Sequence, residues 1–343
     1  MRTLKESELK GFMEILKLDQ IQLKRLMNEY LRKFYPKVVN THDYIYAEGE
    51  IPIALVAHMD TVFEVPCSNI YYDPKMQVMF SPEGLGADDR AGVFSIIQII
   101  RSGLRPHIIL TTDEEMGGLG AMRLSDRPCP FKDLRYIIQL DRRGTTDCVF
   151  YDCENYDFIE YVESFGFIMN YGSFTDISWL CPQWKIAGVN LSIGYENEHT
   201  QHETLSIKSM MATIEKVKKM LIEKDIPQFE YIASEWSKKY YGKTFGSYSS
   251  AYGFGYGYEE IACKKCHKVY LEEEMIPVIS KAGITTFYCP DCVVDNVSWC
   301  VECGEAFETD DPEATTLCPY CENKTGVKTI GLPKNSTTIQ SSN

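Results

Sequence analysis

The chain has 343 residues, of which 44% are hydrophobic and 24% charged, so a large buried core can form. Its 35 Lys+Arg against 49 Asp+Glu leave a formal net charge of −14, which argues against broad binding of nucleic acid or anionic lipid. The sequence contains no run of about 18 apolar residues and no secretory h-region near its start. We therefore expect a cytoplasmic protein without a membrane span.

Residues 1–225 are predicted to form one α/β domain with a mostly parallel central sheet flanked by helices. Helical periodicity indicates two helices within residues 3–34, with a break near Leu18 and Asp19. Further along, the pattern predicts strands at Val38–Tyr46, Ile53–His58, His107–Thr112, Tyr136–Leu140 and Gly188–Ile193, and helices at Ala91–Arg101 and Ile207–Lys224. In a parallel sheet of this kind, functional groups collect in loops at the carboxyl ends of the strands.

Acidic and histidine residues lie at five such positions. The clusters are His58 with Asp60, Asp88 with Asp89, Asp113 to Glu115, Asp141, and His199 with His202. Carboxylates gathered in one cleft repel each other, whereas a bound dication turns the repulsion into attraction. Imidazole and carboxylate ligands favour zinc, with manganese or cobalt as alternatives, and a bridging carboxylate would suit two metals. The Asp88–Asp89 pair could instead cap a helix, and Asp89 is the better candidate for that role.

The C-terminal part is predicted to be a separate zinc-binding module. Eight of the 13 cysteines form four CxxC pairs there: Cys263/Cys266, Cys289/Cys292, Cys300/Cys303 and Cys318/Cys321. Two CxxC turns complete one closed four-cysteine site, so the spacing predicts two zinc ribbons within residues 261–325 and two structural zinc ions. Redox CxxC motifs and disulfides are the alternatives, and both fit four pairs in series poorly.

The remaining segments connect and follow these two parts. Residues 226–260 are predicted to form a helix and a linker rich in Tyr, Gly and Ser, and residues 326–343 a polar tail. Residues 259–343 carry 14 acidic and 7 basic side chains. An acidic ribbon pair suits docking of a protein partner better than nucleic-acid binding.

The order HMDTV, GADDRAG, DEE, LDRRG and EHTxxE resembles the dizinc exopeptidase superfamily, which includes zinc aminopeptidases, peptidase T-like tripeptidases and related carboxypeptidases and deacylases. The resemblance covers about residues 35–225. It implies two catalytic metal ions held by His58, Asp88, Glu115, Asp141 and His199. Asp88 would bridge the metals, its peptide bond to Asp89 being cis. His202 is the alternative ligand if His199 does not bind the metal.

The resemblance also implies catalytic roles. Glu114 would be the general base that activates water, and Asp60 would orient the His58 imidazole. Asp176, in the segment GSFTDISW, would support the site from behind or cap a helix. Apart from the resemblance, Arg142 and Arg143 directly follow Asp141 and are candidates for holding a substrate carboxylate, with Arg143 as the first choice. The interval from Asp141 to His199 spans 58 positions, too few for the lid domain that many deacylase and tripeptidase relatives insert there.

These features predict a dinuclear zinc hydrolase of peptide or amide bonds, with an aminopeptidase as the first expectation. Its substrate would be a peptide or small amide. An N-acyl amino acid deacylase or carboxypeptidase remains open, because loops decide the substrate. A metal-binding protein without catalysis, acting as an adaptor through its ribbons, is the alternative of a different class.

Overall fold

The computed structural model describes residues 4–234, 260–271, 275–280, 285–289, 292, 297–300, 306–309, 317–319 and 321. The chain divides into two compact units, Met1–Gly242 and Lys243–Asn343, which are described one at a time. The Tyr/Gly/Ser-rich part of the predicted linker, the polar tail and Cys303 lie outside the described residues. Within the described ranges, none of the helices has the length and apolar character needed to cross a membrane.

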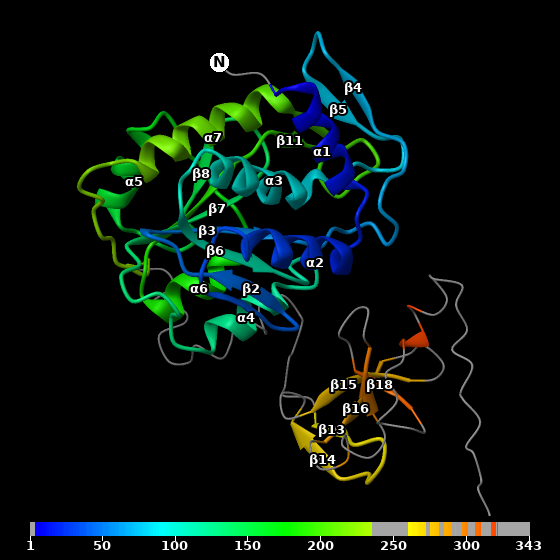
Figure 1. Ribbon diagram of the computed structural model, residues 1–343. Helices are drawn as coiled ribbons and strands as arrows, with labels where there is room; N and C mark the ends of the chain where they lie inside the picture. The colour runs from blue at the N-terminus through cyan, green and yellow to red at the C-terminus, as the bar shows by residue number, and fades with distance from the viewer. Residues whose placement is uncertain are drawn as a thin grey trace, which may run out of the picture. The chain divides into compact units, whose positions relative to one another are not determined.

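An eight-stranded sheet forms the centre of the first unit (Figure 1). Its order is β1-β2-β6-β3-β7-β10-β8-β9. The strands are β1 (Val38–Asn40), β2 (Tyr44–Ala47), β3 (Ile51–His58), β6 (Pro106–Thr111), β7 (Tyr136–Arg142), β8 (Asp147–Val149), β9 (Ile168–Met169) and β10 (Gly188–Ser192). The four central strands, from β6 to β10, pair in parallel, whereas β1, β2 and β8 join antiparallel neighbours. The carboxyl ends of β3, β6, β7 and β10 therefore meet along one edge.

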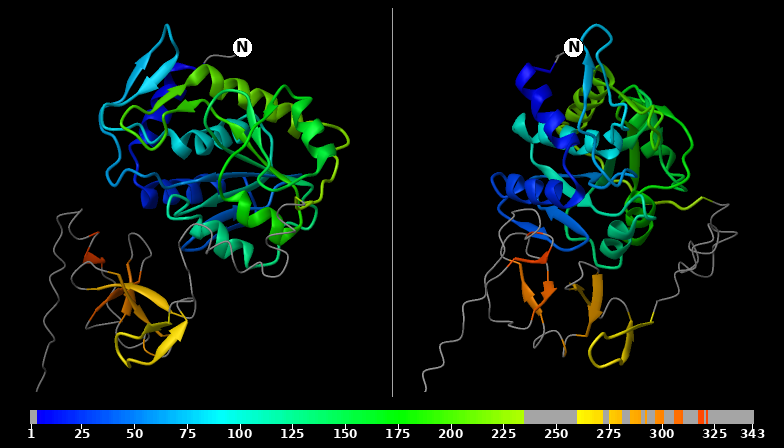
Figure 2. Two further views of the ribbon diagram at one scale, coloured as in Figure 1. Left: turned by 180° about the vertical axis from the view of Figure 1, so that it is seen from behind. Right: turned by 90° about the vertical axis from the view of Figure 1, so that its right-hand side faces the viewer.

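Helices cover both faces of this sheet, which confirms the predicted α/β architecture (Figures 1 and 2). The helices of the unit are α1 (Glu6–Leu16), α2 (Gln20–Leu31), α3 (Ala87–Arg101), α4 (Leu119–Ser125), α5 (Tyr156–Glu163), α6 (Ile177–Trp184) and α7 (Ile207–Leu221). Helix α3 packs on β3 and β7 from one side together with α1 and α7, and α4 and α6 pack on the other.

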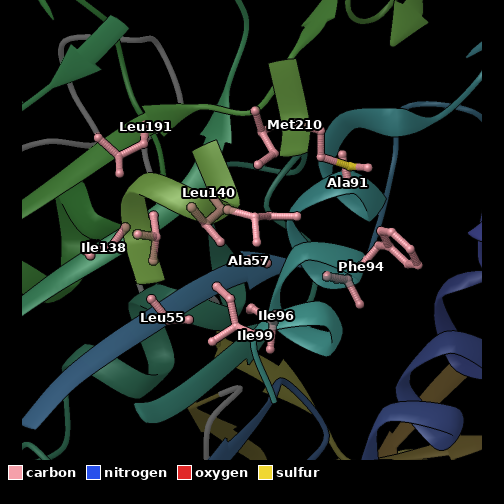
Figure 3. Packing of buried hydrophobic residues seen from close by; sticks show 14 of the residues in the cluster. Leu55, Ala57, Ala91, Phe94, Ile96, Ile99, Ile138, Leu140, Leu191 and Met210 are labelled. Atoms are coloured by element: carbon pink, nitrogen blue, oxygen red, sulfur yellow. The ribbon is translucent and has the colours of Figure 1, made fainter. Parts of the chain in front are cut away.

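Alternation of side chains along β3 explains the two layers. Leu55 and Ala57 face the larger hydrophobic cluster with α3, whereas Ala54 and Val56 face the smaller cluster with α4 and α6. All four side chains are fully buried. Figure 3 shows Leu55 and Ala57 packed against residues of α3, including Ile99. A strand that is apolar on both faces can lie only at the centre of such a sandwich.

Local signals set the boundaries of several helices. Asp19 caps the start of α2: its side chain accepts a hydrogen bond from the Gln22 N–H at 2.8 Å. In turn, the Gln22 side chain accepts one from the Asp19 N–H at 3.2 Å. Gly92 in α3 allows close packing on β7, because a Cβ there would meet the Leu140 carbonyl oxygen at 2.5 Å. The two predicted N-terminal helices are therefore present, with the break where the sequence indicates it.

A second, four-stranded antiparallel sheet with the order β11-β12-β5-β4 adjoins the start of α3. Its strands are β4 (Tyr71–Asp73), β5 (Val78–Phe80), β11 (Tyr195–Glu196) and β12 (Thr204–Ser206). The loop between β11 and β12 contains His199 and His202. This small sheet thus brings the last histidines of the unit back toward residues that precede α3.

Parts of the secondary structure differ from the prediction. The single strand expected at Val38–Tyr46 is wrong: a turn at residues 41–43 divides it into the antiparallel strands β1 and β2. The short strands β4, β5, β8, β9, β11 and β12 and the helices α4, α5 and α6 were not predicted, because they are too short for a clear hydrophobic period. Residues 226–234, which the prediction assigns to the connecting segment, are not helical and form bridges from Glu230 to Ile186 and from Ala233 to Cys153.

The described part of the second unit consists mainly of short strands and cysteines. Its described strands are β13 (Glu260–Ala262), β14 (Val269–Leu271), β15 (Ile276–Ile279), β16 (Thr285–Tyr288), β17 (Val297–Trp299) and β18 (Ala306–Glu308). They form a β13-β14 hairpin and a sheet with the order β16-β15-β18-β17. Its two described buried clusters contain cysteines as core members: Cys263 and Cys289 in one, Cys300, Cys318 and Cys321 in the other.

Candidate metal centre

His58 lies at the carboxyl end of β3, and its imidazole is buried among carboxylates. Its Nδ1 is 3.2 Å from Asp60 Oδ1, and its Nε2 is 3.0 Å from Asp88 Oδ1 and 3.6 Å from Asp141 Oδ1. Burial disfavours the charged ring and by itself would lower the pKa of His58. The contacts with Asp141, Asp60 and Asp88 outweigh burial and raise this pKa well above its usual value. The ring is thus held in place from both of its nitrogens.

Asp88 lies between the two histidines that the prediction assigns to metal binding. Its Oδ1 faces His58, and its Oδ2 is 3.0 Å from His199 Nε2. Burial would raise the pKa of this carboxyl, but its contacts with His199 and His58 hold the pKa below the usual range. The peptide bond between Asp88 and Asp89 is cis, as the resemblance implies. Asp88 therefore presents one oxygen to each side, which is the arrangement that a bridging ligand requires.

Two groups of potential ligands share this aspartate. In one, donor atoms of His58, Asp88 and Asp141 lie within 4.8 Å of each other; in the other, those of Asp88, Glu115 and His199 do. Each group has one imidazole and two carboxylates, a donor set that suits zinc, manganese or cobalt. Glu115 Oε1 is buried without a hydrogen-bond partner, although His199 Nε2 is 3.1 Å away. The donors present thus fit two metal ions on either side of Asp88.

Glu114 is also close to His58 and Glu115 of this site. It lies after β6 and forms a third group with His58 and Glu115, again with donor atoms within 4.8 Å. Burial raises the pKa of Glu114 well above its usual value, and the charges of Asp141 and Asp176 act in the same direction. A carboxyl group with a raised pKa beside a metal site is suited to accept and release protons.

The neighbouring loop is held by Asp60. Its Oδ2 accepts a hydrogen bond from the Glu115 N–H at 3.0 Å while its Oδ1 contacts His58. Arg90, a fully buried residue, lies beside it, with Nη1 3.5 Å from the Asp60 carbonyl oxygen and Nη2 donating to the Leu18 carbonyl oxygen at 2.8 Å. Asp60 therefore joins the end of β3 to the segment carrying Glu114 and Glu115.

Asp141 is fixed by side chains that sequence reasoning did not identify. Thr175 Oγ1 donates to its Oδ2 at 2.6 Å, and the Tyr195 hydroxyl donates to its Oδ1 at 2.8 Å. Asn190 accepts from the Asp141 N–H at 2.9 Å and donates to its carbonyl oxygen at 2.8 Å. Burial and the charge of Asp88 raise the pKa of Asp141 to about 6. Tyr195 follows the end of β10, so position relative to a strand is the one signal that could have pointed to it.

Asp89 and Asp176 are fully buried next to the site. Asp89 Oδ1 accepts from the Gly92 N–H at 2.9 Å, which is a capping contact at the start of the regular part of α3. Asp176 makes no capping hydrogen bond in α6; its Oδ2 accepts instead from Thr111 Oγ1 at 2.6 Å, and its Oδ1 is buried without a partner. Burial raises the pKa of Asp176 to about 7. The contacts of Asp176 therefore fit a role in supporting the site and do not fit a role in capping α6.

Two predicted residues lie apart from this cluster. His202 is exposed and in none of the ligand groups found among the described residues, whereas His199 is in one. Arg143 forms an ion pair with Glu198 at 3.0 Å, and its side chain is 55% exposed. Glu198 directly precedes His199, so the pair links the end of β7 to the loop with the histidines.

The cysteines of the second unit form two further groups. Sγ atoms of Cys263, Cys266, Cys289 and Cys292 lie within 4.8 Å of each other, as do those of Cys300, Cys318 and Cys321. None of these seven cysteines forms a disulfide. Burial disfavours the Cys263 thiolate, but N–H groups of Cys266 and Cys289 lower its pKa to about 6. The first group thus has the complete donor set of a structural zinc site, and its geometry does not match disulfides.

Comparison with known proteins supports the fold. No family model matches the chain, and no curated protein matches its sequence. The aminopeptidase PepT from Bacillus cereus ATCC 10987 superimposes with a TM-score of 0.52 and 15% identity over 64% of this chain and 98% of that chain. A tripeptidase from Staphylococcus aureus subsp. aureus Mu50 does so with a TM-score of 0.53 and 14% identity over the same shares. The first part of the chain therefore shares its fold with this aminopeptidase and this tripeptidase.

Proposed function

We propose that the protein is a dinuclear metallohydrolase of peptide bonds, acting as an aminopeptidase. The observation that carries the proposal is the pair of ligand groups that share Asp88. Five separate segments of the chain converge there, and a buried surplus of carboxylates without cations is unfavourable. The aminopeptidase and tripeptidase structures of similar fold support the choice of reaction.

In this proposal His58, Asp88 and Asp141 hold one metal ion, and Asp88, Glu115 and His199 hold the other. Zinc, or manganese or cobalt in its place, would lower the pKa of water and polarise the scissile carbonyl group. Glu114 accepts the proton of the attacking water, because burial gives its carboxyl a raised pKa. The same carboxyl then delivers the proton to the leaving amine. Asp60 keeps the His58 ring oriented through Nδ1.

The second unit would hold two structural zinc ions and dock a protein partner. Cys263, Cys266, Cys289 and Cys292 form the first site, and Cys300, Cys318 and Cys321 with Cys303 the second. The acidic composition of this part favours a protein partner over nucleic acid. A cytoplasmic location, which suits free cysteines, is part of the same proposal.

Metal analysis combined with a substrate panel tests the proposal. We expect about four zinc ions per chain, two at the catalytic centre and two at the cysteines, by the donor sets described above. Aminoacyl substrates with a free amino terminus should be hydrolysed faster than N-acyl amino acids or substrates that offer only a free carboxyl terminus. A chain with only two zinc ions and no hydrolysis of any substrate would contradict the proposal and favour the adaptor.

A deacylase or carboxypeptidase is the second candidate, since an exposed guanidinium belongs to the segment that directly follows Asp141. Arg143 follows Asp141 by two positions and pairs with Glu198. A substrate carboxylate would have to take the place of Glu198 in this ion pair. Selective loss of activity toward substrates with a free carboxylate in Arg143→Ala would favour this candidate, and unchanged activity on all substrates would exclude it.

A further inference from the structure

The loop between β11 and β12 gives His199 little support of its own. The His199 side chain is 51% exposed, and its backbone has a φ of 63°, a left-handed conformation that is unusual for a residue other than glycine. Its partners Asp88 and Glu115 belong to other segments, and 111 positions separate Asp88 from His199. The ion pair of Glu198 with the exposed Arg143 links this loop to the end of β7, and a buried contact is needed to hold the loop at the correct distance from Asp88.

Glu203 provides that contact. Its side chain is 1% exposed, although it lies only four positions after His199. Its Oε2 accepts a hydrogen bond from the Gly86 N–H at 2.6 Å, and its Oε1 accepts from the Asp88 N–H at 2.9 Å. These N–H groups lie at the beginning of α3, where backbone donors have no partner within the helix and favour a negative charge.

The backbone around Glu203 is anchored as well. The Glu203 N–H donates to the Thr200 carbonyl oxygen at 3.1 Å, which closes the turn that directly follows His199. Directly after Glu203, β12 pairs with β5, with Thr204 opposite Phe80. The carboxylate therefore extends from a fixed strand end to the start of α3, and the turn that directly follows His199 is closed by the same residue.

We propose that Glu203 is a positioning residue that holds His199 in register with Asp88, so that the second ligand group is formed before metal binds. The inference rests on the proposed function. His58 and Asp141 lie on β3 and β7 and do not depend on this loop. Loss of the Glu203 contact should therefore weaken one of the two catalytic metal sites much more than the other.

The test is metal affinity in the full-length protein, with zinc kept at the cysteines. Glu203→Gln retains the size of the side chain but replaces one acceptor oxygen with an NH₂ donor, which would face an N–H group of α3. We expect the affinity of one catalytic metal equivalent to fall about 10- to 100-fold, the usual effect of removing an outer partner of a ligand, and the other to change far less. Competition with a chromogenic chelator measures both equivalents.

Two comparisons separate positioning from a general structural role. Glu196 is an exposed glutamate at the end of β11, just before the same loop. Glu196→Gln should bind both metals as the unaltered protein does. In a His199→Ala background, Glu203→Gln should add little further loss, because its effect passes through His199. An equal loss at both sites, or an undiminished loss in the His199→Ala background, would overturn the inference.

If Glu203→Gln does not fold, Glu203→Asp takes its place. Its shorter carboxylate keeps the charge but cannot reach both N–H groups from the same backbone position, so the same selective loss is expected. Unchanged affinity at both sites in this variant would also overturn the inference. If the unaltered protein binds no metal outside its cysteines, the proposed function itself fails. If the unaltered protein binds both catalytic metals and Glu203→Gln binds them equally well, only the inference about Glu203 fails.

Discussion

In the first unit, ligand candidates come from segments far apart in sequence, whereas in the second unit they come in pairs with only two residues between them. His58, Glu115 and Asp141 lie at or after the ends of parallel strands that meet at one edge of a sheet. Asp88 lies at the start of α3, and the small antiparallel sheet brings His199 back to it. The cysteines of each CxxC pair are brought together by a single turn. The first unit also has a large hydrophobic core that is independent of its ligands, while cysteines form part of the buried clusters of the second.

Metal removal should separate the two units most clearly. The second unit should lose its structure, since structural zinc sites in small domains contribute apparent binding free energies of about 10–16 kcal/mol. The first unit should stay folded on its core. Hydrogen exchange measured by mass spectrometry after treatment with a strong chelator would resolve the two responses. Equal loss of protection in both units would show that the comparison is mistaken.

A substitution of the proposed base should abolish chemistry without removing metal. Glu114→Gln keeps the volume of the side chain but cannot accept a proton, so kcat should fall by about 10²- to 10⁴-fold. Metal content should remain that of the unaltered protein, because Glu114 is not a proposed ligand. Steady-state kinetics and metal analysis on the same preparation test both statements. A Glu114→Gln protein with full activity would remove Glu114 from the mechanism.

Truncation of a core side chain should affect the first unit alone. Leu55→Ala leaves a cavity between β3 and α3 and should lower the free energy of unfolding of this unit by about 2–5 kcal/mol. Ile21→Ala, at a side chain that is 49% exposed on α2, should change it by less than about 0.5 kcal/mol. Denaturant titration compares the two variants, and similar losses in both would contradict the assignment of the core.

The buried carboxyl of Asp176 should make the first unit sensitive to pH when metal is absent. Burial raises its pKa to about 7 from a usual value of 3.8, so between these values the folded state holds a proton that the unfolded state has released. The free energy of unfolding should therefore fall as pH rises from about 4 to 7. Melting temperatures of the metal-free protein should follow this decline, and Asp176→Asn should make it shallower, since the buried carboxyl of Asp141 has a raised pKa as well. A melting temperature that rises through this window would contradict the sign.

The smallest expected effect concerns a helix cap. Asp19→Ala removes the side-chain acceptor of the Gln22 N–H and should cost about 1 kcal/mol of stability in the first unit. Asp19→Asn, which keeps a capping oxygen, should recover most of the loss. Thermal unfolding of the two variants measures the difference, and equal melting temperatures would exclude a capping role.

The sequence pattern predicted the long elements of the fold well. β3, β6, β7, β10, α3 and α7 have apolar runs or clear helical periods, so their positions follow from local hydrophobicity. Strands of two to four residues, such as β8 and β11, form through pairing with distant partners and have no such signal. The division of Val38–Tyr46 into two strands likewise reflects pairing with β6, which no local pattern encodes.

For the candidate site, residue types and order were readable from the sequence, and contacts were not. His58, Asp88 and Asp141 could be selected because each follows or precedes a predicted element at the functional edge. Which histidine of the last loop lies beside Asp88 depended on a turn and on the Glu203 contact, both set by tertiary structure. The hydrogen bonds of Thr175 and Tyr195 to Asp141 join segments more than thirty positions apart and were equally invisible.

By itself, the amino-acid sequence determined the α/β layers, the cysteine pairs and the kinds of donor that could hold metal, because hydrophobic period and short spacing are local properties. Only the tertiary structure decided that Asp88 stands between two groups of potential ligands and that His199, and not His202, belongs to one of them. These facts depend on strand pairing and on hydrogen bonds across more than a hundred residues, for which the free energy comes from the folded core as a whole.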